Sequence, residues 1–172
     1  MGSIAVYPGT FDPITNGHID LLERSLKIFD RVIIAIAINP GGKQPMFTPG
    51  ERMELIEGFL EHHPLRDRVK VDIFSGLLVD YVKSIPAKTI IRGLRVISDF
   101  EYEFQMALMN RKLNSDIETA FIMTGMRWIY ISSGIIKDVA CVGGDISGLV
   151  PENVEEKLMK RLENAGKDNL CY

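Results

Sequence analysis

A stretch near the start of the chain combines residue types that bind phosphate. It runs from Tyr7 to His18 and reads Tyr-Pro-Gly-Thr-Phe-Asp-Pro-Ile-Thr-Asn-Gly-His. Gly9 has no Cβ, so a ligand can come close to the backbone there, while Pro8 and Pro13 fix φ and stiffen the loop. A stiff loop of this kind, ending in a histidine, is suited to holding a phosphate and donating a hydrogen bond to it.

The residues on either side place this stretch between a strand and a helix. The apolar run 4–7 suits a buried strand. After the stretch, apolar residues recur three and four apart, which is typical of one face of a helix: Ile19, Leu22, Leu26 and Phe29. A helix that begins near Gly17 points unpaired N–H groups and a partial positive charge at the loop. The sequence therefore predicts a phosphate site, with His18 in the first helical turn.

The rest of the sequence alternates short apolar runs with helical patterns. Further strands are expected at 32–38, 69–73, 89–91 and 120–123. The run 32–38 is continuously apolar, which is typical of a central parallel strand, whereas 69–73 alternates with charges and suits a place nearer an edge. Helices are expected from about 49, 77, 98, 134 and 151, the first of them with a capping box at Thr48 and Glu51. Alternating strands and helices predict an α/β fold, a Rossmann-like open parallel sheet with helices on both faces.

Polar and other unusual residues follow each predicted strand. Since ligands of open parallel sheets bind beyond the carboxyl ends of the strands, these residues are expected to meet at one edge. In strand order they are Thr10 and His18, then Lys43, then Leu77 and Leu78, then Arg92 and Arg95, and last Ser132 and Ser133. Their convergence predicts a site that offers several cations and no paired carboxylates, which suits phosphate chemistry.

Composition narrows the class of protein. The chain has 172 residues, 46% of them hydrophobic and 25% charged, which predicts one globular domain over 1–172, with a final helix at about 151–165 and a loose tail. The net charge of −3 argues against a general nucleic-acid binder. No apolar run is long enough to cross a membrane, and no signal peptide is recognisable. Cys141 and Cys171 show no metal-ligand spacing, so we expect a reducing compartment, the cytoplasm, and no disulfide.

The motifs together resemble a known family. Residues 9–13 followed by 15–18 look like the signature of the T/H-x-G-H nucleotidyltransferases. The similarity covers about 4–162 and includes Arg-Gly-Leu-Arg at 92–95, Asp-Phe-Glu-Tyr-Glu at 99–103 and Ile-Ser-Ser at 131–133. Within that superfamily the whole chain resembles the phosphopantetheine adenylyltransferases.

The resemblance implies a reaction and its partners. Such an enzyme reversibly transfers the adenylyl group of ATP to 4′-phosphopantetheine, giving dephospho-coenzyme A and pyrophosphate on the way to coenzyme A. It also implies the strand order 3-2-1-4-5, a homohexamer and feedback by coenzyme A. Mg²⁺ is expected to come with ATP and to be held by its phosphates and water, without a protein metal cage. The acceptor phosphate is already an anion, so direct in-line attack needs alignment and charge neutralisation, with no covalent enzyme intermediate.

The resemblance also assigns roles residue by residue. The catalytic set is Thr10, His18, Lys43 and Arg92, with His18 donating a hydrogen bond to the α-phosphate in the transition state. The acceptor side is expected at Thr10, Lys43, Leu77, Leu78 and Arg92. The ATP side is expected at Thr10, Phe11, His18, Gly93, Leu94, Arg95, Glu103, Trp128, Ile129, Tyr130, Ile131, Ser132, Ser133 and Gly134. Ser133 is expected to cap the helix that receives the triphosphate.

Each assignment has a plainer structural alternative. His18 could only cap a helix, Lys43 could be a solvated surface lysine, and Arg92 could form a salt bridge, although the end of a strand argues against that. The chain departs from the family at two places. Lys43 aligns with the family's loop lysine only if one residue is inserted at 41–42, and Gly134 stands where the family usually has Ser or Thr.

Three other functions can be compared with this assignment. A relative that acts on nicotinate mononucleotide would more often carry His-x-Gly-His where this chain has Thr-Asn-Gly-His at 15–18. A catalytically silent nucleotide sensor is disfavoured by the intact set of Thr10, His18, Lys43 and Arg92. A dinucleotide oxidoreductase is disfavoured because no Gly-x-Gly-x-x-Gly follows the first strand.

Overall fold

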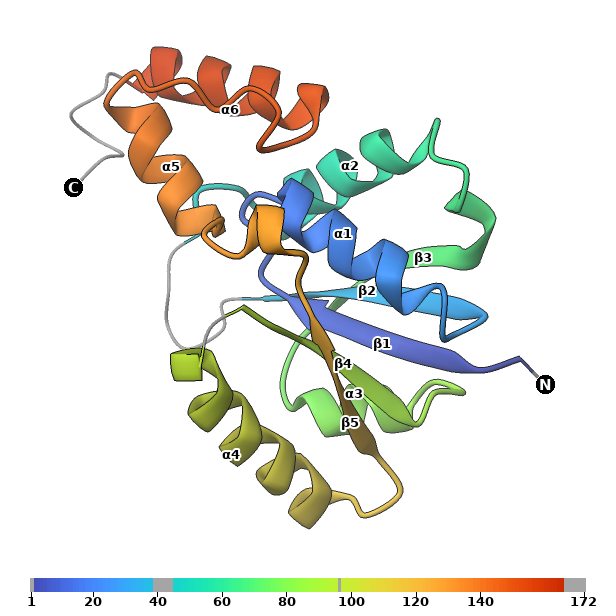
Figure 1. Cartoon of the computed structure of the whole chain (residues 1–172). Coiled ribbons are helices and arrows are strands. Elements are labelled where there is room, and N and C mark those ends of the chain that lie inside the picture. The colour runs from blue at the N-terminus through green and yellow to red at the C-terminus, as the bar shows by residue number, and fades with distance from the viewer. Residues whose placement is uncertain (1, 39–44, 96, 166–172) are drawn as a thin grey trace.

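The computed structural model describes residues 2–38, 45–95 and 97–165, and residues 1, 39–44, 96 and 166–172 lie outside the description. Its centre is a parallel sheet in the order β3-β2-β1-β4-β5 (Figure 1). The strands are β1 (Ile4–Gly9), β2 (Arg31–Ala37), β3 (Val69–Phe74), β4 (Thr89–Leu94) and β5 (Glu118–Met123). Both the Rossmann-like α/β fold and the strand order implied by the resemblance are confirmed.

Helices cover both faces of the sheet (Figure 1). One face carries α1 (Asn16–Ser25), α2 (Pro49–Leu60), α5 (Ser133–Cys141) and α6 (Glu152–Ala165). The other face carries α3 (Leu78–Lys83) and α4 (Ile97–Leu113). Two short 3₁₀ turns complete the described elements, η2 (Arg66–Arg68) and η3 (Met126–Trp128). The expected helices therefore all form, and the expected capping box at Thr48 and Glu51 begins α2.

The two faces of the sheet bury different clusters. Because side chains alternate along a strand, Ala5 and Tyr7 of β1 join the large cluster under α1, α2, α5 and α6, while Val6 joins a smaller cluster. The smaller cluster is completed by Val79 and Val82 of α3. The continuous apolar run of β2 is explained in the same way, since a central strand is covered on both sides.

β1 and β4 run further than the sequence predicts, to Gly9 and Leu94, and both lead into the site. In β1 the pairing with β2 continues through Pro8 and Gly9. Pro8 is tolerated there because β1 pairs with β4 only at Ala5 and Val6, so its missing N–H interrupts no ladder on that side. Beyond Val6 the carboxyl ends of β1 and β4 are therefore unpaired with each other, at the point where strand order reverses.

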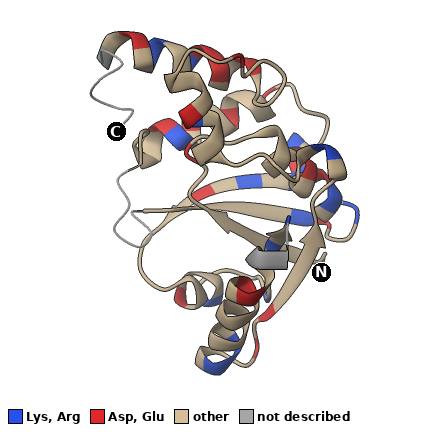
Figure 2. Cartoon of the chain, turned by 60° about the vertical axis from the view of Figure 1, so that its left-hand side comes forward, with Lys and Arg blue, Asp and Glu red and all other residues tan. Residues whose placement is uncertain are grey.

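Other features bear on the expectations from composition. Among the described residues, no helix has the length and apolar character that a membrane span requires. Acidic and basic residues are mixed along α6 at the top of Figure 2.

Cys141, at the end of α5, is disulfide-bonded, so the expectation of no disulfide is wrong at this residue. Two cysteines far apart in a chain without a cysteine motif give no signal for pairing, and the second cysteine lies outside the described residues.

Candidate active site

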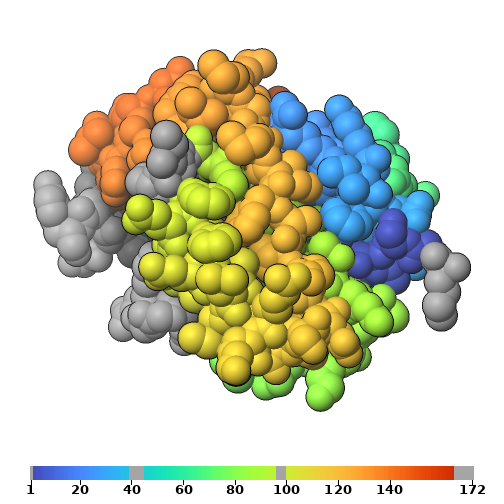
Figure 3. All heavy atoms as spheres, turned by 60° about the horizontal axis from the view of Figure 1, so that its bottom comes forward, coloured from blue at the N-terminus to red at the C-terminus, as the bar shows by residue number. Residues whose placement is uncertain are grey.

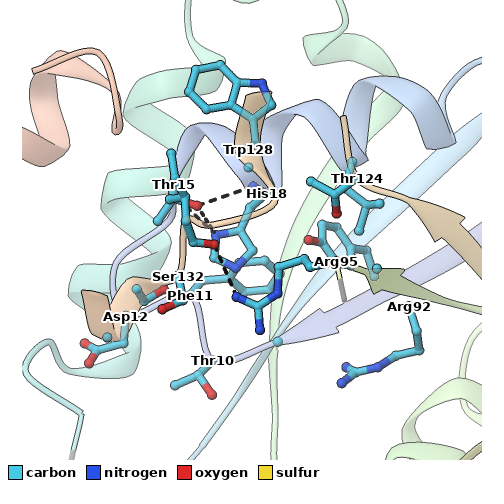
Figure 4. A pocket seen from close by; sticks show the side chains of 18 of the residues that line it. Thr10, Phe11, Asp12, Thr15, His18, Arg92, Arg95, Thr124, Trp128 and Ser132 are labelled. Carbon is cyan, nitrogen blue, oxygen red and sulfur yellow. Dashed lines mark hydrogen bonds between the residues drawn. The ribbon is translucent and has the colours of Figure 1, made fainter. Parts of the chain in front are cut away.

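A cavity of about 830 Å³ opens at the carboxyl ends of β1 and β4. It lies where open parallel sheets bind ligands, because the strand order reverses there. The loop after β1, the start of α1, the end of β4, the segment after β5 and the start of α5 all contribute to its wall (Figure 4). Of the residues predicted from the sequence, those that line it are Thr10, Phe11, His18, Arg92, Gly93, Arg95, Glu103, Trp128, Ile131, Ser132, Ser133 and Gly134.

His18 is held in one orientation by the start of its own helix. Thr15 is the N-cap of α1, and His18 occupies the third helical position, where Glu or Gln usually completes a capping box. The backbone N–H of Thr15 donates to Nδ1 of His18 at 3.0 Å. Nδ1 is therefore the acceptor nitrogen of the neutral ring, and the proton sits on Nε2. The helix cap thus prepares His18 as a hydrogen-bond donor through Nε2.

The surroundings of His18 keep its imidazole neutral. Burial, and to a smaller extent the positive charge of Arg95, lower the pKa of His18 to about 4. The folded protein therefore favours the neutral imidazole over the protonated one. The stability that depends on this neutral ring is fully present above the ordinary pKa of about 6.5, and it is lost as the pH falls towards 4. Near neutral pH the ring is therefore a neutral donor, which suits electrostatic stabilisation of a phosphate without proton transfer.

Phe11 supports the ring of His18 from the side. The two ring centroids are 5.2 Å apart in an edge-to-face arrangement, and Phe11 makes a similar contact with Tyr7. Phe11 has φ 51°, a conformation that L-residues rarely adopt. A Cβ on Gly9 would lie 2.9 Å from the Phe11 ring. Gly9 therefore makes room for the ring of Phe11, in addition to the close approach of a ligand that the sequence predicts.

Arg92 lines the cavity, and part of its guanidinium is already hydrogen-bonded within the protein. Its Nε donates to Oε2 of Glu103 at 2.6 Å, and its Nη2 forms a second ion-paired contact with Oε1 of the same carboxylate. Its Nη1 donates to the carbonyl of Pro8 at 3.1 Å. Burial opposes the charge of Arg92, but Glu103 outweighs burial and raises the pKa of Arg92. The expectation that Arg92 forms no salt bridge at this strand end is therefore wrong, because Arg92 pairs with Glu103.

The start of α5 forms the opposite wall of the cavity. The N-cap is Ser132, whose Oγ accepts from the N–H of Ile135 at 3.2 Å. Ser133 is the first helical residue, and its hydroxyl donates to the carbonyl of Pro13 at 2.7 Å. The expectation that Ser133 is the cap is therefore wrong by one residue, because the extended backbone that an N-cap requires occurs at Ser132. A Cβ on Gly134 would meet only Ser132 Oγ, at 3.8 Å, so the site has room for the usual hydroxyl.

Asp12 joins three parts of the site. Its side chain is almost wholly buried and accepts from the backbone N–H groups of Met46 at 2.9 Å and Phe47 at 2.8 Å. It also pairs with Nζ of Lys137 on α5 at 2.6 Å. Lys137 lines the cavity and adds a cation that is not predicted from the sequence. Asp12 therefore has a structural role. It connects the loop after β1 to the residues just before α2 and to α5.

Further cavity residues were not predicted from the sequence: Tyr7, Asp12, Thr15, Leu21, Tyr102, Thr124 and Lys137. Signals existed for some of them. Asp12 and Thr15 lie inside the motif, and Thr124 directly follows β5 at the same edge as the other strand-end residues. Lys137 lies one helical turn after Ser133, which is itself a predicted site residue. Tyr102 and Leu21 reach the cavity from α4 and α1, and no specific sequence signal points to either of them.

Other predicted site residues do not line this cavity: Leu77, Leu78, Leu94, Ile129 and Tyr130. Leu77 is exposed at the start of α3, whereas Leu78 packs against the smaller cluster. Their contacts with a pantetheine arm or with ATP stay predictions. Lys43 lies outside the described residues. Among the residues that the structure describes, no group of three acidic, histidine or cysteine side chains is placed to hold a metal ion.

Comparison with known proteins decides the family. Residues 6–139 match the model of the family described as Cytidylyltransferase-like. The phosphopantetheine adenylyltransferase of Desulfotalea psychrophila is 59% identical, and the match covers 92% of each chain. That of Desulfosudis oleivorans is 56% identical, again over 92% of each chain, and that of Syntrophus aciditrophicus is 53% identical over 97% of this chain and 100% of its own. The chain belongs to the phosphopantetheine adenylyltransferase family. It is therefore a nucleotidyltransferase.

Solved structures support the fold of this adenylyltransferase family member. A putative nicotinate-nucleotide adenylyltransferase from Vibrio parahaemolyticus superposes with a TM-score of 0.69 at 22% identity, covering 92% of this chain and 99% of that one. At such identity the likeness extends to the fold and not to the substrate. The nicotinate mononucleotide alternative therefore gains nothing from this match.

Proposed function

We propose that the protein transfers the adenylyl group of ATP to 4′-phosphopantetheine, giving dephospho-coenzyme A and pyrophosphate in the synthesis of coenzyme A. The observation that carries the proposal is the identity of 52–59% with phosphopantetheine adenylyltransferases over nearly the whole chain. The cavity supports it, because it presents a neutral histidine donor, two arginines, a lysine and the start of α5 around one space.

The proposed chemistry is a single in-line displacement. An oxygen of the acceptor phosphate forms a bond to the α-phosphorus of ATP, and the bond between that phosphorus and the bridging oxygen to the β-phosphate breaks. Pyrophosphate leaves with the electron pair, and the same steps reversed give ATP. The attacking oxygen is already an anion, so no residue has to remove a proton, and no covalent enzyme intermediate forms.

We propose that each residue of the cavity binds the phosphate group nearest to its place in the cavity wall. His18 donates from Nε2 to the α-phosphate, where negative charge increases in the transition state. The N–H groups at the start of α5, with Ser132, Ser133 and Gly134, receive the triphosphate. Arg92 and Thr10, at the ends of β4 and β1, receive the acceptor phosphate. We propose that Arg95 adds positive charge on the ATP side, and that Lys43, which lies outside the described residues, does so on the acceptor side.

Mg²⁺ is proposed to enter with ATP. The two carboxylates of the cavity are already engaged by cations, Asp12 by Lys137 and Glu103 by Arg92. Phosphate oxygens and water are therefore the ligands that the site leaves for the metal. When bound, Mg²⁺ neutralises charge on the leaving pyrophosphate. Coenzyme A shares the pantetheine arm with the acceptor, and we propose that it inhibits by competing for the acceptor side.

A homohexamer acting in the cytoplasm completes the proposal, and α4 supports an assembly of several copies. This helix lies across the face shown in Figure 3 and presents large apolar side chains to solvent. They are Phe100, Tyr102, Phe104, Met106, Leu108, Met109 and Leu113. Large exposed apolar side chains gathered along one helix are typical of a surface that another copy covers.

The acceptor is tested by measuring pyrophosphate release. We expect release when the protein is incubated with ATP, Mg²⁺ and 4′-phosphopantetheine, and none above background with nicotinate mononucleotide or without an acceptor. Equal or faster release with nicotinate mononucleotide would contradict the proposed acceptor. ATP binding without release with any acceptor would favour a nucleotide sensor.

The start of α5 gives a second expected result. Ser132→Ala removes the N-cap, so we expect a loss of about 1 kcal/mol in the free energy of unfolding and a raised KM for ATP. Gly134→Ser is the matched control, because a Cβ there would meet only Ser132 Oγ, at an ordinary contact distance of 3.8 Å, and it should leave kcat within a few-fold. Steady-state kinetics and urea unfolding of both variants check this. An increase of activity by orders of magnitude in Gly134→Ser would mean that the natural site is impaired.

A further inference from the structure

The segment between β5 and α5 forms one wall of the cavity. Three of its residues line the cavity, Thr124, Trp128 and Ile131. The segment leads directly into α5, whose first N–H groups receive the triphosphate in the proposed function. Figure 4 shows Thr124 and Trp128 beside the helix that carries His18. The way this segment docks on α1 therefore sets the distance between the ATP side of the cavity and His18.

The carboxylate of Asp20 joins this segment to α1. Asp20 lies two residues after His18, and its Oδ2 accepts from the backbone N–H of Gly125 at 2.8 Å. Its side chain is 18% exposed, and it is not among the described residues that line the cavity. Trp128 lies against the start of the same helix, because a Cβ on Gly17 would be 3.6 Å from the Cβ of Trp128. The wall is therefore fixed to the helix that carries His18, from behind the cavity.

The ion pair with Arg24 does not by itself explain this carboxylate. Nε of Arg24 donates to the same oxygen of Asp20 at 2.8 Å, one helical turn further along α1. The side chain of Arg24 is 44% exposed, and exposed pairs of this kind contribute little to stability. The N–H of Gly125, by contrast, needs an acceptor that only a side chain of α1 supplies.

The glycine at 125 fits the contact with Asp20. A Cβ there would lie 3.1 Å from each carboxylate oxygen of Asp20 and 2.9 Å from Nη2 of Arg24. The φ of Gly125 is −58°, which any residue can adopt, so the close approach and not the backbone angle calls for glycine. At the other end of the segment, Nη1 of Arg95 donates to the carbonyl of Ile131 at 3.2 Å. Charged side chains thus hold the segment near both of its ends.

We propose that Asp20 is a positioning residue for ATP, which acts through the N–H of Gly125 and touches neither substrate. It holds the segment 124–131 against α1, so that the ATP side of the cavity and His18 keep one relative position. The inference rests on the proposed function for the assignment of this wall to ATP. The link between Asp20 and Gly125 is independent of that assignment.

Two replacements of Asp20 separate the hydrogen bond from the charge. Asp20→Ala removes the acceptor, and we expect KM for ATP to rise about tenfold, with KM for 4′-phosphopantetheine changed less than about twofold. Asp20→Asn keeps an oxygen that can accept from Gly125, so its KM for ATP should lie within about threefold of the natural value. Equal rises of both KM values in Asp20→Ala would indicate a general loss of structure and would overturn the positioning role.

Arg24→Met is the matched control, because it removes the ion pair and leaves the N–H of Gly125 with its acceptor. Its KM for ATP should stay within about twofold of the natural value. A rise as large as that of Asp20→Ala would show that the ion pair, and not the contact with Gly125, matters for ATP.

A double variant tests whether Asp20 acts through Gly125. Gly125→Ala should displace the carboxylate and raise KM for ATP by itself. Combined with Asp20→Ala it should add little, because no carboxylate remains to be displaced. Fully additive effects of the two replacements would overturn the proposed link.

Calorimetry keeps the test independent of turnover. We expect the dissociation constant of a non-hydrolysable ATP analogue to be about tenfold higher for Asp20→Ala than for the natural protein, and close to natural for Asp20→Asn and Arg24→Met. Unchanged affinity in a folded Asp20→Ala variant, with folding checked by urea unfolding, would overturn the proposal. If the natural protein binds the analogue but releases no pyrophosphate with 4′-phosphopantetheine, the proposed function fails, while the calorimetric comparison still decides the role of Asp20.

Discussion

His18→Ala is expected to lower kcat for adenylyl transfer by about a hundredfold or more, with much smaller changes in KM for either substrate. The reason is that the donor at Nε2 contacts charge that increases in the transition state, and the loss of one such donor costs roughly 3 kcal/mol. Steady-state assays of pyrophosphate release measure the change in kcat. A variant with near-normal kcat would refute the role of His18.

A measurement of the protonation state of His18 provides a control for this prediction. Because the pKa of His18 is lowered to about 4, its ring should stay neutral, with the proton on Nε2, from pH 8 down to pH 5 in the ligand-free protein. NMR of the imidazole nitrogens reports both the protonation state and the tautomer, and His18→Ala identifies the signal. A titration midpoint near 6.5 would mean that the site does not favour the neutral ring, and that His18 meets the phosphate as a cation.

Arg52→Met should cost the protein about 3 kcal/mol of its free energy of unfolding. Arg52 is wholly buried under the site, and its guanidinium donates to the carbonyls of Thr10 at 2.6 Å and Ala37 at 3.1 Å, with a longer contact to Thr48. Methionine fills similar space but leaves these carbonyls without a donor. Relief from burying a charge offsets part of the loss, since burial lowers the pKa of Arg52.

Urea unfolding measures this loss, and Arg66→Met provides a matched comparison. Arg66 is exposed at the 3₁₀ turn before β3, so its replacement should change stability by less than about 0.5 kcal/mol. Equal effects of the two replacements would show that the buried contacts of Arg52 contribute nothing. Because Arg52 fixes the carbonyl of Thr10, we also expect the surviving folded fraction of Arg52→Met to bind both substrates more weakly.

The sequence alone determined most of the fold because its patterns are local. The continuous apolar run of β2, the alternation in β3 and the capping box at Thr48 each follow from neighbouring residues. The position of the site also followed, since every strand of a parallel sheet ends at the same edge. The placement of His18 in the first turn of α1 was predictable from the glycine before it and the apolar spacing after it.

Only the tertiary structure decided how the charged residues pair. Arg92 with Glu103, Asp12 with Lys137 and Arg52 with the carbonyl of Thr10 join residues that lie far apart in the sequence or on different elements. The sequence shows that these charges exist, but a charge finds its partner through the packing of the elements that carry it. The same reason explains the one-residue error at Ser132, because both serines suit an N-cap and only the backbone path into α5 separates them. In this protein, local pattern placed Arg92 and Arg95 at the site, and tertiary packing added Lys137 and decided which charged groups pair with one another.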